Sequence, residues 1–210
     1  MKNSKTSDLV QLSLFVAIIV LMAVTPFLGY IPLGITRATI IHVPVIIGSI
    51  ILGPKKGGFL GFVFGLTSLL TNTFNPTVTS FVFSPFYSLG NYSGNFLSLV
   101  ICFVPRILVG IVPYYVYRAL KKKVNSDALS LTIAGVCGSM TNTLLVMNMI
   151  YLFFGTSYAA AKNVEMNALY GIILGVIGIN GVPEAIVAGV LTAAVAKVLL
   201  KYQKRTVAVS

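Results

Sequence analysis

The sequence is poor in the residues that carry acid, base and metal chemistry. Among 210 residues there are four acidic side chains, one histidine and two cysteines. Asp8 and Asp127 are expected at the cytoplasmic ends of apolar segments, and Glu165 lies in a connecting loop. Glu184 therefore has no second carboxylate near it inside the membrane with which to form an acid/base pair. These absences argue against an enzyme.

Other absences narrow the class of protein further. Cys102 and Cys137 lie inside apolar segments without metal-ligand spacing, so packing is their expected role, and we expect no cofactor or metal. No glycine-rich loop ends in Lys-Ser/Thr, so the chain is not expected to hydrolyse nucleotides, and energy must come from a partner or a gradient. The sequence shows no internal repeat, which weighs against an inverted-repeat secondary transporter.

What the sequence has in abundance is apolar residues. They make up 57% of the chain against 9% charged residues, and the mean hydropathy is +0.95, as in an integral membrane protein. The formal net charge of +11 does not indicate nucleic-acid binding, because the basic residues are divided among short loops between apolar segments. This is the distribution that the positive-inside rule describes.

The apolar segments predict a single all-α transmembrane domain with six spans. Most basic residues fall in loops on the side of both termini, with Arg37 and Lys162 on the other side, so both termini are expected in the cytoplasm. The second span is short for a membrane crossing. The last apolar region is interrupted at 178–184, where turn formers predict that the final helix begins near Pro183. The expected spans are 8–25, 39–53, 57–72, 95–118, 128–154 and 171–200.

Glycine and lysine mark the centre of the chain. Lys55 and Lys56 occupy a Gly/Pro turn between two apolar segments, which predicts a cytoplasmic hairpin. Gly57, Gly61 and Gly65 then recur every four residues and form a smooth helix face, suited to close packing inside the protein or against a partner.

Two stretches are expected to be loops. Pro26 to Ala38 is rich in turn formers. Between Phe74 and Gly94, aromatic residues alternate with hydroxyls and turn formers, which is too polar for a span and too aromatic for an ordinary linker. We expect this stretch to fold over the outer membrane face or to cap a pocket.

One cation stands out in the fourth span. No charged side chain occurs from Gly57 to Pro105, and Arg106 follows deep inside an apolar segment. A cation at that depth costs about 2.5 to 3.5 kcal/mol on insertion scales, so it requires a partner or a water-filled cavity. Pro105 is expected to free a helix carbonyl beside it. Arg106 therefore marks a candidate binding site, the alternative being a structural ion pair with Glu184.

Several further polar residues are expected in the outer half of the membrane or near its middle. Amides offer donors and acceptors, and arginine offers a fork for a carboxylate or phosphate, so together they suit a small polar, anionic solute. The alternative is that the asparagines hold helices together. The residues are Asn72, Asn75, Asn142, Asn180 and Glu184, with Arg106.

Two further motifs carry a resemblance to a known family. Leu52-Gly53-Pro54-Lys55-Lys56-Gly57-Gly58-Phe59-Leu60-Gly61 forms the second hairpin, and Pro105-Arg106-Ile107-Leu108-Val109-Gly110 lies in the fourth span. With the length and the six spans, the chain resembles the substrate-binding S components of energy-coupling factor (ECF) vitamin transporters. The stretches 31–44, which contains Arg37 and His42, and 75–81 look most like the pantothenate-specific members.

The resemblance implies a six-helix subunit in a prokaryotic plasma membrane that captures a vitamin from outside with high affinity. Such a subunit joins a transmembrane coupling protein and two ATPases, and topples to release its cargo inside. In the family the first helix presents an Ala-x-x-x-Ala face to the coupling protein. Ser13 and Ala17 stand at the matching positions here, so one alanine is replaced by another small residue.

For pantothenate, the resemblance and the residue chemistry give a hypothesis for the site. Arg106 would bind the carboxylate, Asn72 and Asn142 the amide and hydroxyls, and Phe81 or Tyr87 would cover the methyl groups. Arg37 lies in an outer loop that covers the ligand in relatives. His42, the single histidine, has no second ligand for a metal and is included as a polar neighbour of the site.

Two alternatives remain open from the sequence. The chain is an S component for another vitamin or precursor, such as folate, riboflavin, pyridoxine or hydroxymethylpyrimidine, or it is a solitary gradient-driven transporter or channel. Planar ligands would favour aromatic stacking over an arginine fork. The missing repeat and the scarcity of intramembrane carboxylates count against the gradient-driven transporter.

Overall fold

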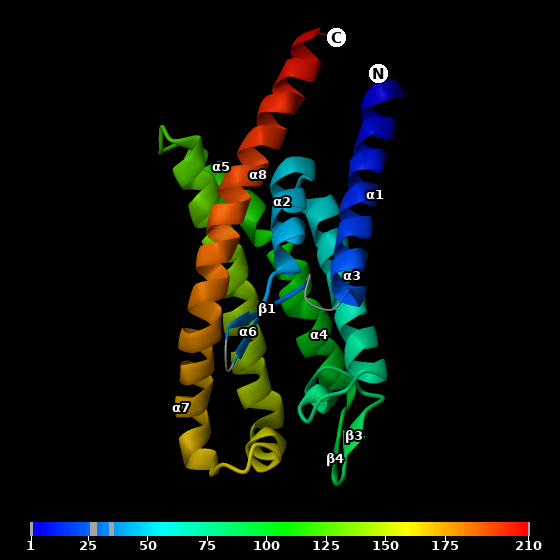
Figure 1. Cartoon of the computed structure of the whole chain (residues 1–210), viewed down its shortest axis with the longest axis vertical. Coiled ribbons are helices and arrows are strands. Elements are labelled where there is room, and N and C mark those ends of the chain that lie inside the picture. The colour runs from blue at the N-terminus through cyan, green and yellow to red at the C-terminus, as the bar shows by residue number, and fades with distance from the viewer. Residues whose placement is uncertain (1, 26–28, 34–35, 210) are drawn as a thin grey trace.

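Long helices run roughly along one axis and form a bundle (Figure 1). The computed structural model describes residues 2–25, 29–33 and 36–209, with side chains described at 6–25, 29 and 39–202. The helices of these parts are α1 (Lys2–Val24), α2 (His42–Leu52), α3 (Pro54–Phe74), α4 (Phe96–Val109), α5 (Val112–Lys121), α6 (Asp127–Ala161), α7 (Met166–Val176) and α8 (Val182–Val209).

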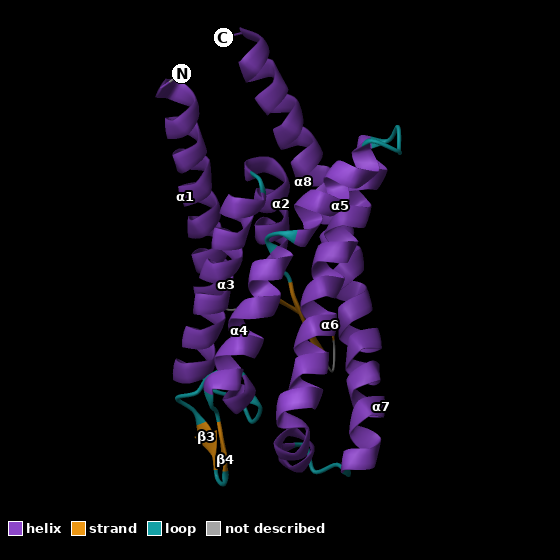
Figure 2. Ribbon diagram, turned by 180° about the vertical axis from the view of Figure 1, so that it is seen from behind, coloured by secondary structure: helices purple, strands orange, loops and turns teal. Residues whose placement is uncertain are grey.

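Shorter elements connect the helices. β1 (Tyr30–Leu33) pairs with β2 (Thr36–Thr39) in an antiparallel hairpin, and β3 (Ser88–Leu89) pairs with β4 (Tyr92–Ser93) in another. The first hairpin lies in the middle of the bundle in both views (Figures 1 and 2). A 3₁₀ turn, η1 (Ser80–Val82), precedes the second hairpin, and a π-helical segment, η2 (Ile177–Gly181), joins α7 to α8.

Five helical segments of the described chain are long and apolar enough to cross a membrane: Thr6–Val24, Pro54–Phe74, Phe96–Lys121, Asp127–Ala161 and Met166–Tyr202. The sixth apolar helix, α2, has 11 residues. It is therefore about 16 Å long, against a hydrocarbon core of about 30 Å. Its residues from His42 to Ile50 are buried by neighbouring helices. The shortness of this segment, noted in the sequence, thus goes with shielding by protein.

The α2–α3 turn has the residues that its geometry requires. Gly53 has a φ of 89°, which a side chain rarely tolerates, and Pro54 occupies the start of α3, where a missing N–H is harmless. Figure 1 places this lysine-bearing turn, the α5–α6 turn and both chain ends at the same end of the bundle. The β3–β4 hairpin and the α6–α7 turn lie at the opposite end.

The glycine face of α3 packs inside the protein. A Cβ on Gly57 would overlap the Gly110 carbonyl oxygen, and one on Gly61 would overlap the Arg106 carbonyl. Gly65 meets the ring of Phe103 in the same way. Of the two expectations for this face, packing inside the protein is therefore confirmed. The contact sets the depth at which α4 carries Arg106.

The last α-helix, α8, begins at Val182, as expected near Pro183, but the expected break in front of it is absent from the described chain. Helix runs continuously from α7 through η2 into α8. A π-helical turn accommodates a residue without an N–H, so Pro183 and its neighbouring glycines alter the helix without ending it. The expectation that Pro26 to Ala38 forms a plain loop is also corrected where the backbone is described, because β1 and β2 form a hairpin there. Residues 26–28 and 34–35 lie outside the described chain.

Two clusters of apolar side chains form the interior. The first apolar cluster surrounds α2 and includes Val45, Ile46 and Leu60. The second apolar cluster gathers around η1, α6 and α7 and includes Phe81 and Ile150. The space between these two clusters holds the candidate site.

Candidate functional site

A cavity of about 260 Å³ lies among the helices and the β1–β2 hairpin. It separates the two apolar clusters, since Ile41 and Phe64 of the first and Val146 of the second both reach its walls. Small-molecule sites measure roughly 300 to 1,000 Å³, so this cavity suits a small solute. The lining residues are Ala23, Thr39, Ile41, Phe64, Thr67, Ser68, Thr71, Asn72, Phe83, Arg106, Asn142, Thr143, Val146, Met147, Val176, Asn180 and Glu184.

Arg106 provides the charge of one wall. Its side chain is 7% exposed and lies between two aromatic rings, 5.1 Å from the Phe83 centroid and 5.7 Å from that of Phe64. Its Nη1 donates to the Ile101 carbonyl at 2.8 Å. Proline at position 105 has no N–H for the carbonyl four residues earlier, which is that of Ile101. The expectation that Pro105 frees a carbonyl for the arginine is confirmed.

Helix α3 supplies a polar strip beside Arg106. Thr67 and Thr71 lie four residues apart, and so do Ser68 and Asn72, so these two adjacent pairs share one helix face. The Asn72 amide donates to the Ser68 carbonyl at 2.8 Å and accepts from the Ser80 hydroxyl at 2.7 Å. It thereby fastens the η1 turn to α3. Asn72 both lines the cavity and holds the loop that follows α3.

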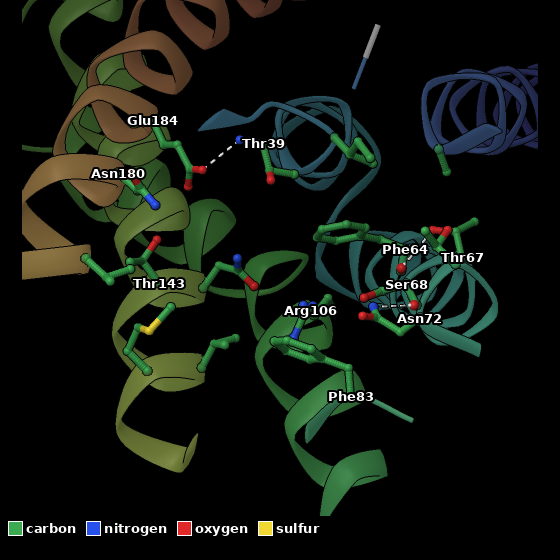
Figure 3. A pocket seen from close by; sticks show the side chains of 17 residues that line it. Thr39, Phe64, Thr67, Ser68, Asn72, Phe83, Arg106, Thr143, Asn180 and Glu184 are labelled. Carbon is green, nitrogen blue, oxygen red and sulfur yellow. Dashed lines mark hydrogen bonds between the residues drawn. The ribbon is translucent and has the colours of Figure 1, made fainter. Parts of the chain in front are cut away.

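The other wall is built by α6, η2, α8 and the end of β2. Glu184 is 8% exposed, and its Oε1 accepts a hydrogen bond from the backbone N–H of Thr39 at 2.7 Å. The buried Oδ1 atoms of Asn142 and Asn180 accept no hydrogen bond from any described residue. Figure 3 shows Arg106 with Phe83 and Asn72 on one side, and Glu184 with Asn180 and Thr143 on the other.

A cavity of mixed polarity inside a membrane bundle is the geometry of a solute-binding site, and comparison with known proteins identifies the family. The family model described as "ECF transporter, substrate-specific component" matches residues 7–196. The chain belongs to this family. The membership confirms the resemblance found in the sequence, and the five apolar helices agree with an S-component bundle in a multi-pass membrane protein.

Two curated relatives cover almost the whole S component. The Pantothenic acid transporter PanT of Lactococcus lactis subsp. cremoris is 41% identical over 203 residues, which is 96% of this chain and 97% of the relative. The Pantothenate transporter PanT of Leuconostoc mesenteroides subsp. mesenteroides is 30% identical over 213 residues, or 98% of each chain.

The cavity brings together five of the residues singled out in the sequence of this S component. They come from five helical segments, α3, α4, α6, η2 and α8, and from positions up to 112 residues apart, since Asn72 and Glu184 line the same space. Arg106 and Glu184 stand on different walls, and Glu184 is held by the Thr39 N–H. The five residues are Asn72, Arg106, Asn142, Asn180 and Glu184.

Other predicted residues lie outside this lining. Asn75 caps the end of α3 and is exposed, while Phe81 is fully buried against Phe154, with ring centroids 5.9 Å apart. Tyr87 packs against the second apolar cluster. His42 is 1% exposed at the start of α2. The Arg37 side chain lies outside the described residues.

Several lining residues were not singled out in the sequence. Phe64, Thr67 and Ser68 belong to the expected third span, and their spacing with Thr71 and Asn72 marks one face of it. This helical spacing could have identified the polar face of the span, which an average of hydropathy over the segment does not show. Phe83 was recognised only as part of an aromatic loop, and Thr39 takes part through its backbone, which no side-chain pattern reveals.

Proposed function

We propose that this S component binds pantothenate. Both curated relatives carry that ligand in their names, and the first shares 41% of its residues over nearly the full chain. The observation that carries the proposal is the buried guanidinium of Arg106 on the wall of the cavity. A desolvated guanidinium favours an anionic partner, and its fork matches a carboxylate.

In this proposal Arg106 binds the carboxylate of pantothenate. The aromatic rings of Phe64 and Phe83 hold the guanidinium in place through cation–π contacts, which are worth up to about 2 kcal/mol when desolvated. Asn142 meets the amide or a hydroxyl, and Asn72 adds the amide hydrogen that its bond to Ser68 leaves over. His42, Asn75, Phe81 and Tyr87 stand outside the cavity lining, and in this proposal they and Arg37 support the site from around it.

We further propose that the protein works with a transmembrane coupling protein and two ATPases in a prokaryotic plasma membrane. The bundle end that carries both termini and the lysine-rich turns faces the cytoplasm, because basic residues are retained on that side. Ser13 and Ala17 are exposed on α1, in a helix that buries little of its surface. Their small side chains offer the coupling protein a close approach.

Replacing Arg106 tests the ligand site. Arg106→Ala should weaken pantothenate binding about 10- to 150-fold in calorimetry, because a buried charge-assisted contact is worth about 1.5 to 3 kcal/mol. Arg118→Ala removes an exposed arginine of α5 outside the cavity and should leave the affinity unchanged. An unaltered affinity in Arg106→Ala would remove this residue from the site.

The alternative ligands are separated by the same measurement. Folate, riboflavin, pyridoxine and hydroxymethylpyrimidine are titrated against the purified protein, and ligand that co-purifies is identified by mass spectrometry. Tighter binding of a planar ring compound than of pantothenate would refute the proposed substrate. Uptake that persists in cells lacking the ATPases would refute the proposed partnership and favour a gradient-driven transporter.

A further inference from the structure

The two walls of the cavity differ in the kind of hydrogen bond that they offer. A guanidinium can only donate, whereas a carboxylate can only accept. Arg106 is on α4, and Glu184 is on α8 at the opposite wall (Figure 3). A solute that spans the cavity therefore meets a donor at one end and an acceptor at the other.

Glu184 uses one oxygen for the protein itself. Its Oε1 accepts from the Thr39 N–H at 2.7 Å, and this is the hydrogen bond that the described residues supply to the carboxylate. Thr39 ends β2 and pairs with Tyr30, so the bond fixes the β1–β2 hairpin to α8. The described ion pairs, Lys56–Asp8 and Lys121–Asp127, involve other carboxylates. No described cation therefore neutralises Glu184.

The surroundings of Glu184 hold further acceptors that lack donors. The Oδ1 atoms of Asn142 and Asn180 are buried and accept nothing from the described residues. Asn180 is placed on this wall by the π-helical segment, one turn before Glu184. A buried acceptor without a donor is unfavourable, and for a carboxylate the penalty is larger. This wall is built to receive hydrogen-bond donors from a solute.

We propose that Glu184 selects for hydroxyl groups at the end of the ligand remote from its carboxylate. Oε1 holds the hairpin and Oε2 accepts the hydroxyl, with the amide oxygens of Asn142 and Asn180 beside it. This inference rests on the proposed function and gives pantothenate one orientation: its carboxylate lies at Arg106 and its two hydroxyls lie at Glu184. The protein then distinguishes pantothenate from other solutes by both its carboxylate and its hydroxyl groups.

The experiment compares Glu184→Gln with wild type, using two ligands. Glutamine keeps an oxygen for the Thr39 N–H but replaces the second acceptor by an NH₂ donor. Pantothenate should bind Glu184→Gln about 10- to 100-fold more weakly than wild type in calorimetry. A pantothenate analogue with both hydroxyls replaced by hydrogen should bind the two proteins equally, because it makes no contact with Oε2.

Glu165→Gln is the matched control. It makes the same change at an exposed carboxylate before α7, outside the cavity, and should bind both ligands as wild type does. Unchanged pantothenate affinity in Glu184→Gln overturns the inference, and it is also the result expected if the Glu184 carboxyl presents a proton to the cavity. Equal weakening for both ligands overturns it as well, because Glu184 then acts through the fold alone.

The same data separate this inference from the proposed function. If wild type binds pantothenate and Glu184→Gln behaves as wild type, the substrate stands and the role of Glu184 falls. If wild type does not bind pantothenate, the proposed substrate falls, together with the orientation built on it.

Discussion

Arg106 is tolerated inside the membrane because its neighbours are arranged around it. Phe64 and Phe83 face the guanidinium, and the Ile101 carbonyl, freed by Pro105, accepts one of its hydrogens. A helix carbonyl without its usual partner is an unfavourable group in a membrane, and so is a cation. The hydrogen bond between the Ile101 carbonyl and the Arg106 guanidinium lowers the cost of placing both groups in the membrane. The Pro-Arg pair is thus a local device that orients a charge toward the cavity.

Pro105 should therefore act as a positioning residue. In Pro105→Ala the new N–H competes with Arg106 for the Ile101 carbonyl, so the helix gains stability while the guanidinium loses part of its anchor. Pantothenate affinity should fall about 3- to 10-fold, the value of one ordinary hydrogen bond. Calorimetry and thermal unfolding together check this. Pro113→Ala, at the start of α5, is the control, and a Pro105→Ala protein with unchanged affinity would contradict the role.

At the scale of the elements, the α3–α4 contact decides where the site lies. Gly61 on α3 touches the backbone at Arg106, and Gly57 meets Gly110 near the end of α4. Glycine lets the two backbones approach each other more closely than any side chain allows. Since α3 carries the hydroxyl strip and α4 carries the arginine, their separation sets the width of that wall.

A methyl group at Gly61 should push the two helices apart. Gly61→Ala should destabilise the protein by about 1 to 3 kcal/mol, as overpacking does, and lower the midpoint of thermal unfolding by roughly 2 to 10 °C. Pantothenate affinity should also fall, because the wall formed by α3 and α4 is displaced. Gly171→Ala offers a matched control, because nothing lies near a Cβ there and α7 gains helix propensity. An equal effect of both changes would show that packing at Gly61 is not tight.

The elements that follow from periodicity and composition were predictable, and those set by tertiary contacts were not. Apolar runs indicated the long helices, and the glycine repeat indicated their packing, because lipid exposure and close approach constrain residue type directly. The β1–β2 hairpin is held by the contact between Thr39 and Glu184, which lies far along the chain. The π-helical segment looked like a break because glycine and proline there also occur in turns.

The residues of the candidate site also divide into those that composition predicts and those that only the structure reveals. Charged and amide residues in apolar segments are conspicuous, so Arg106, Asn142 and Glu184 were found from the sequence. Threonine and serine are common in membrane helices, so the hydroxyl strip of α3 did not stand out. Phe81 was selected for its ring, but the structure buries it against Phe154. Aromatic identity alone does not separate a packing residue from a lining one.

At the scale of the whole molecule, basic residues and exposed aromatic rings gather at opposite ends of the bundle. The lysine-rich turns and both termini lie at one end, and the β3–β4 hairpin lies at the other (Figure 1). Exposed Phe74, Phe86 and Phe96 belong to or border the loop between α3 and α4. Aromatic rings favour the membrane interface, and lysines favour the cytoplasmic side. Both distributions support the proposed direction of the bundle in the membrane, with the termini in the cytoplasm.

This direction predicts a labelling pattern. Lys162→Cys, at the exposed α6–α7 turn, should react in intact cells with a maleimide that does not cross membranes, whereas Lys122→Cys should react only after the cells are broken. The unaltered chain, with Cys102 and Cys137, gives the background. The reverse pattern would place both termini outside and would contradict the proposed orientation.

A solute bound between the two apolar clusters becomes part of the protein interior, because side chains of both clusters reach the cavity. Unfolding of either half then requires its release. At a free concentration 100-fold above the dissociation constant, this coupling adds about 2.7 kcal/mol to the stability of the folded protein. The transported nutrient would thus also act as a folding aid, and cells starved of it would carry the protein in its less stable, empty form.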